Sequence, residues 1–293
     1  RVTLLRGEHF PHNYNAVTRS IMYSWMNKHL KLGQPEPVKE LDWKPLSKEE
    51  YSVWNDEHPC PDGGPSYERQ LLQQLDERDR AALFNHQPQT SNETQNYVST
   101  VRAAWQTLIG RQLPKAEDVQ RAKGWKEVQA GYIEFGDTLT LTTHAEQLPI
   151  ISVYPKSVEW NQKVVLWIDG NGKTGMFPNG TAHPELLRLI NAGYAVVAAD
   201  LFGQGEFTTN GESLTENITV KNPRQFAGYT YCYNETVFAR RVHDILTVAA
   251  WVGGDEHSPK AVHAIGVNGG GPLLAAARTI AGSAINAAAI DTA

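Results

Sequence analysis

The stretch Gly266-Val267-Asn268-Gly269-Gly270-Gly271 decides the fold of this chain. An apolar run at 261–265 precedes it, and an alanine-rich run at 272–277 follows. A short apolar run favours a buried strand, clustered glycines favour a sharp turn, and the run after them favours a helix. The sequence therefore predicts a strand, a tight turn and a helix in direct succession.

The spacing of Gly266 and Gly270 resembles the G-x-S-x-G nucleophile elbow of α/β-hydrolases. The nucleophile position holds Asn268, whose carboxamide nitrogen is a very poor nucleophile. Asn does tolerate the positive φ that such a turn requires. We therefore expect Asn268 to mark a degenerate nucleophile position, with the backbone N–H of Gly269 as half of an oxyanion hole. A glycine-rich phosphate loop is the alternative, although the Lys-Ser/Thr of a P-loop is missing.

Two further loops follow apolar runs in the order found in α/β-hydrolases. Asp169-Gly170-Asn171-Gly172 stands where those enzymes carry an H-G-G-G-type oxyanion loop, so Asn171 is a second candidate donor. An ordinary turn after a strand is the alternative there. The segment 200–206 resembles a D-x-x-G-x-G segment of the same enzymes and ends in Glu206. Together the three motifs predict an α/β fold with an α/β-hydrolase-type sheet.

The periodicity of the chain predicts the elements of that sheet and of a helical segment before it. Strands are expected at 128–135 and 139–143, paired as a hairpin, and at 150–154, 163–169, 195–200, 261–265 and 287–290. Helices are expected at 16–31, 66–84, 93–109, 185–191 and 235–252, with a short strand at 1–5. We expect the sheet to be cut after about the sixth strand of the hydrolase fold.

The first 33 residues resemble the end of another α/β-hydrolase domain. The turn His12-Asn13-Tyr14-Asn15 is similar to the turn that carries the catalytic His in acetyl xylan esterase-like, prolyl-oligopeptidase-related hydrolases, including tandem-domain members. The resemblance implies that His12 is the general base of a preceding domain. His9 lacks the Asn-Tyr-Asn context, and a surface His in a turn is the alternative.

These motifs predict three segments: the end of a preceding hydrolase domain at 1–33, a linker with a helical hairpin at 34–126, and the first part of a second hydrolase domain at 127–293. Hydrolases of this kind place the catalytic acid and His after the nucleophile. The acid would follow a strand after Ala293 and the His would come later still, so we expect the second domain to lack a complete triad and to be inactive. The resemblance implies a fragment of a serine esterase that hydrolyses carboxylic esters on polysaccharide. A non-catalytic hydrolase-like module for structure or substrate docking is the alternative, and deamidation of Asn268 to a nucleophilic Asp is another.

Composition restricts the partners. The 293 residues are 41% hydrophobic and carry a formal charge of −5, which gives no reason to expect nucleic acid or an anionic membrane. The two cysteines, Cys60 and Cys232, have no metal-binding spacing, and we expect unpaired thiols, no metal and no cofactor. The expected partners are a small-molecule or polysaccharide ester and the preceding hydrolase domain. The sequence does not determine the cellular compartment, although an extracytoplasmic location is favoured.

Overall fold

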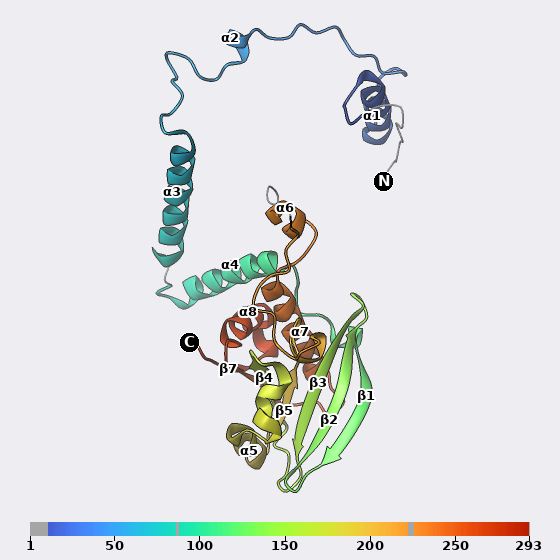
Figure 1. Cartoon of the computed structure of the whole chain (residues 1–293), viewed down its shortest axis with the longest axis vertical. Helices are drawn as coiled ribbons and strands as arrows, with labels where there is room; N and C mark the ends of the chain where they lie inside the picture. Colours follow the sequence, from blue (N-terminus) through green and yellow to red (C-terminus); the bar gives the residue numbers. More distant parts are fainter. Residues whose placement is uncertain (1–10, 86–87, 222–225, 293) are drawn as a thin grey trace. The chain divides into compact units, whose positions relative to one another are not determined.

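The computed structural model describes residues 11–85, 88–221 and 226–292. The chain divides into two compact units, Arg1–Phe84 and Asn85–Ala293, and each is described by itself. Figure 1 traces the elements along the chain. The domain boundaries expected at 33 and 126 remain predictions.

The first unit contains α1 (Ala16–Leu30), α2 (Lys48–Tyr51) and nearly all of α3 (Gly64–Asn85). Asn15 caps the N-terminus of α1, because its side chain accepts a hydrogen bond from the backbone N–H of Thr18 in the first turn. Arg19 and Tyr23 both donate to the carboxylate of Glu40, which fastens the following segment to α1. The helices predicted at 16–31 and 66–84 are confirmed, while the strand predicted at 1–5 lies outside the described residues.

The second unit is built on a seven-stranded sheet with the order β1-β2-β3-β5-β4-β6-β7 (Figure 1). β1, β2 and β3 pair antiparallel, β3 also runs antiparallel to β5, and β5, β4, β6 and β7 are parallel. The strands are β1 (Val119–Val128), β2 (Tyr132–Leu141), β3 (Glu146–Pro155), β4 (Lys163–Asp169), β5 (Ala195–Ala199), β6 (Ala261–Val267) and β7 (Ala287–Ile290). The predicted α/β-hydrolase-type sheet, entered through antiparallel strands, is confirmed.

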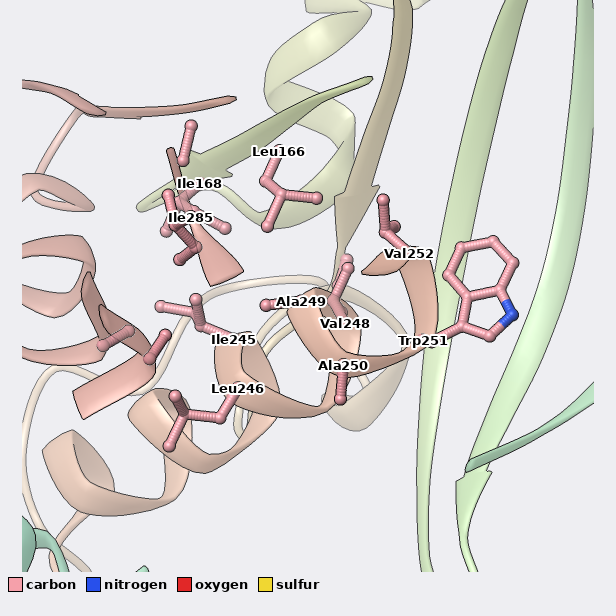
Figure 2. Packing of buried hydrophobic residues seen from close by; sticks show 14 of the residues in the cluster. Leu166, Ile168, Ile245, Leu246, Val248, Ala249, Ala250, Trp251, Val252 and Ile285 are labelled. Atoms are coloured by element: carbon pink, nitrogen blue, oxygen red, sulfur yellow. The ribbon is translucent and has the colours of Figure 1, made fainter. Parts of the chain in front are cut away.

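Helices cover both faces of this sheet. α7 (Val237–Gly253) and α8 (Gly271–Ala281) pack on one face, α4 (Ser91–Ile109) contacts both of them, and α5 (Pro184–Asn191) packs against β3 and β5. Side chains alternate along β4 between the two resulting cores, so Leu166 belongs to the α7 side and Val165 to the α5 side. Figure 2 shows Leu166 in one cluster with Ile245 and Val248 of α7. A short α6 (Phe226–Tyr231) precedes α7.

One predicted hairpin was wrong. The sequence predicted strands at 128–135 and 139–143 with a turn between them, whereas β2 runs unbroken through Gly136 and pairs with β1. The register shifts between Lys123 and Trp125, and the side chain of Trp125 lies directly over Gly136. Asp137 accepts a hydrogen bond from the N–H of Gly124. Gly136 and Asp137 therefore lie opposite a β-bulge at Gly124 of β1 and do not form a turn.

Candidate functional site

The glycine-rich stretch forms the tight turn that its spacing predicts. β6 ends at Val267, α8 begins at Gly271, and Asn268 between them has φ 51°. The N–H of Gly270 donates to the carbonyl of Val267 over 2.8 Å. A Cβ added at Gly270 would lie 2.3 Å from the carbonyl oxygen of Ile168, so the close approach to β4 requires glycine there. The turn from β6 into α8, called the elbow below, is therefore tight and places the carboxamide of Asn268 at its apex.

The side chain of Asn268 is held by a buried carboxylate. Its Nδ2 donates to both oxygens of Asp169, at 3.2 and 3.1 Å. Asp169 also accepts from the indole N–H of Trp167 at 3.2 Å and from the backbone N–H of Asn171 at 2.9 Å. Only 2% of Asp169 is exposed. The sequence indicated Asp169 only as the first residue of a loop, yet this carboxylate organises the whole elbow.

The two predicted oxyanion donors have different surroundings. The N–H of Asn171 is directed at Asp169, so its hydrogen bond is made within the protein. The N–H of Gly269 has no hydrogen-bond partner among the residues described, and Gly269 itself has φ 84°. Asn171 and Asn268 line the same cleft, because the parallel strands β4 and β6 bring the loops at their carboxyl ends to one edge of the sheet.

That cleft has a volume of about 680 Å³ and contains two further residues of catalytic type, His183 and Ser213. His183 caps the N-terminus of α5, and its Nδ1 accepts a hydrogen bond from the N–H of Glu185 at 3.1 Å. The hydroxyl of Ser213 donates to the carbonyl of Gly170 at 2.8 Å. Each side chain is therefore bonded to backbone, and no His–Ser hydrogen bond links them in the described chain. The remaining lining residues are Thr174, Gly175, Phe177, Pro178, Asn179, Gly211 and Glu212.

His12 lies in the first unit, ahead of α1, and is exposed. The residues after it form a compact turn in which Asn13 accepts the N–H of Asn15 at 3.1 Å. Its role as a general base remains a prediction. His9 lies outside the described residues.

The segment after β5 forms a second buried polar centre. The ammonium of Lys173 contacts the carboxylate of Asp200 at 2.6 Å and that of Glu206. The backbone N–H groups of Lys173 and Glu206 donate to Asp200 as well, each at 3.0 Å. Gly205 packs directly on this carboxylate, which accounts for the second glycine of the D-x-x-G-x-G segment. The segment therefore fixes the loop after β4 to the loop after β5, a role the motif alone did not indicate.

Asp244 of α7 is a half-buried acid beside the same loop. Burial raises the pKa of its carboxyl to about 7, against the opposing effect of the Phe202 N–H that donates to it at 2.6 Å. The pKa of this carboxyl is higher in the folded state than in the unfolded state, where it is about 4. The free energy of unfolding therefore falls as pH rises from about 4 to about 7.

We expect Asp244→Asn to remove this pH dependence. The variant keeps an oxygen that accepts from Phe202 but cannot ionise, so it should be more stable than the native chain at pH 8 by about 1–3 kcal/mol and nearly equal to it at pH 4.5. Urea unfolding at both pH values measures the difference. An unchanged slope of stability against pH would show that Asp244 does not titrate in this range.

Within the described residues, no group of three or more His, Cys, Asp or Glu side chains is arranged to hold a metal ion. Cys60 and Cys232 are both exposed free thiols, as predicted. No described helix combines the length and the hydropathy of a membrane span.

Comparison with known proteins shows which of them share this fold. No protein-family model and no curated protein sequence matches the chain. A solved structure from Bacteroides fragilis, described as a candidate acetyl xylan esterase, superimposes with a TM-score of 0.54 over 71% of this chain and 57% of its own, at 18% identity. The fold is that of an α/β-hydrolase. The chain spans little more than half the length of that protein.

Two other α/β-hydrolase structures are less similar. Acetyl xylan esterase 1 from Thermoanaerobacterium matches with a TM-score of 0.40 and 15% identity, over 60% of this chain and 52% of its own. A glucuronoyl esterase from Teredinibacter turnerae has a TM-score of 0.40 and 14% identity, over 67% of this chain and 52% of its own.

Proposed function

We propose that the sheet unit is a non-catalytic α/β-hydrolase domain of an esterase-type protein. The observation that carries the proposal is the pairing of Asn268 with Asp169, with 3.1 and 3.2 Å from the amide nitrogen to the two carboxylate oxygens. An elbow that performs acyl transfer needs an ionisable nucleophile beside a base. Here the apex carries a carboxamide, and its hydrogens are directed into a buried carboxylate.

The surroundings of the elbow also oppose oxyanion stabilisation. An oxyanion hole requires donors that are free to meet developing negative charge. The Asn171 N–H instead bonds Asp169, which places negative charge where a tetrahedral intermediate would need positive potential. The cleft above the elbow, with its amides and hydroxyls, supports a role in substrate docking.

In this proposal, hydrolysis of carboxylic esters on polysaccharide belongs to a preceding hydrolase domain. The support is the His12-Asn13-Tyr14-Asn15 turn, which would contribute the general base of that domain, and the esterase names of the structures that share the fold. The partners are then an ester substrate and the preceding domain.

The experiment is labelling with a serine-directed fluorophosphonate, read by intact mass and peptide mapping. We expect no adduct on the 293-residue chain, and none at position 268 of the Asn268→Ser variant, because no imidazole of the described residues hydrogen-bonds to residue 268. In the complete protein, a serine ahead of the sheet unit should be labelled. An adduct at position 268 of that variant would overturn the proposal that the elbow is non-catalytic. If no serine ahead of the sheet unit were labelled, the proposal of a preceding esterase domain would be overturned. The same maps show whether residue 268 is Asn or has deamidated.

A further inference from the structure

A second cavity, of about 860 Å³, lies on the α5 side of the sheet. It is bounded by the β1–β2 turn, by α5 and by the loop after β4, and Asn268 does not line it. Thr174 and Phe177 line both this cavity and the elbow cleft, so the loop that carries them separates the two spaces. Its apolar wall is formed by Ile151, Leu187 and Ile190.

Two carboxylates face this cavity together. Glu127 of β1 and Glu134 of β2 are directly opposite in the antiparallel register, and both line the space. Directly opposed residues share a face of the sheet, and like charges in such a pair repel. Burial, and next the charge of Glu127, raise the pKa of Glu134. Only 8% of Glu134 is exposed, so water relieves little of this repulsion.

No cation of the described chain neutralises this pair. The side chains of Gln129 and Tyr132, both neutral, act on the pKa of Glu134 by lowering it. Neither Glu127 nor Glu134 forms a salt bridge with a described residue. Lys173 also lines the cavity, but its ammonium already contacts the carboxylates of Asp200 and Glu206. A buried carboxylate without a counter-ion is unfavourable, and a bound cation would relieve it.

The aromatic residues of the cavity suit the same kind of ligand. Tyr132 and Phe177 both line it, and the faces of aromatic rings attract ammonium and guanidinium groups. We propose that this cavity binds an organic cation, with its ammonium or guanidinium group at Glu134 and Glu127 and its hydrocarbon part against Phe177 and Leu187. This site is independent of the chemistry of the elbow.

Isothermal titration of the 293-residue chain tests the charge preference with three probes of one size: phenethylammonium, 2-phenylethanol and phenylacetate. We expect phenethylammonium to bind with a Kd of about 1 mM or tighter, and each of the other two probes to bind at least about tenfold more weakly. No heat from phenethylammonium up to about 10 mM, or equal binding of phenylacetate, would overturn the proposal.

Two variants locate the site. Glu134→Gln should weaken phenethylammonium binding about tenfold or more, and Glu127→Gln, which changes a more exposed side chain, by a smaller factor. Glu185→Gln removes an exposed charge from α5 outside the lining and should leave binding unchanged. Circular dichroism checks that each variant is folded. Undiminished binding in both cavity variants, or an equal loss in Glu185→Gln, would place the cation elsewhere.

Discussion

Replacing Asp169 with Ala is expected to lower the free energy of unfolding of the sheet unit by about 3 kcal/mol or more. The carboxylate accepts from Trp167, Asn171 and Asn268, and it lies in a buried position. The substitution leaves those donors without an acceptor, and an unsatisfied buried polar group is destabilising by about 1–3 kcal/mol. Urea unfolding followed by circular dichroism measures the loss.

Two variants control this prediction. Asp169→Asn keeps one oxygen for the backbone N–H of Asn171, so its loss should be smaller than that of the Ala variant. Glu256→Ala removes an exposed carboxylate and should change stability by no more than about 0.5 kcal/mol. If Asp169→Ala were as harmless as Glu256→Ala, the hydrogen bonds around Asp169 would not hold the elbow.

Gly170→Ala is expected to be strongly destabilising because the backbone of the elbow lies directly against this glycine. An added Cβ would lie 1.8 Å from the backbone carbonyl oxygen of Asn268, so the β4 loop and the elbow would have to separate. The positions of the added Cβ and of the carbonyl oxygen are both fixed by the backbone, so no side-chain rotation can relieve the clash. We expect a loss of about 4 kcal/mol or more, or failure to accumulate as folded protein.

Gly253→Ala is the matched control for that substitution. Gly253 ends α7, and an added Cβ there would meet nothing within 4 Å. Alanine in a compatible helical position stabilises by about 0.4–1 kcal/mol, chiefly by restricting the unfolded chain. The measurement is the midpoint temperature of thermal unfolding of both variants. A midpoint for Gly170→Ala close to that of Gly253→Ala would contradict the close packing of the elbow on β4.

The sequence was most informative where local chemistry determines structure. Glycine spacing and the tolerance of Asn for positive φ predicted the elbow, and Asn268 has φ 51°. Apolar runs predicted β4 and β7 with their observed bounds. The hairpin predicted between 128–135 and 139–143 was wrong because Gly136 signals a turn in sequence, while in three dimensions its missing side chain makes room for Trp125 within the β1–β2 ladder.

The site depended on contacts that no local pattern encodes. Asp169 and Asn268 are 99 positions apart, and nothing in either segment shows that their side chains meet. Lys173 likewise reaches Asp200 across 27 positions. Both contacts arise because parallel strands bring their carboxyl-end loops to one edge of the sheet. The carboxylate pair of the second cavity depends on the register of β1 and β2, and the sequence prediction put a turn within β2 instead.

We propose that the elbow holds a residue, Asn268, that performs no acyl transfer. The most direct measurement is hydrolysis of 4-nitrophenyl acetate by the purified 293-residue chain, compared with Asn268→Ala. We predict that the two proteins are indistinguishable, with no turnover assigned to the elbow. Saturable hydrolysis by the native chain that falls about tenfold or more in Asn268→Ala would contradict the account.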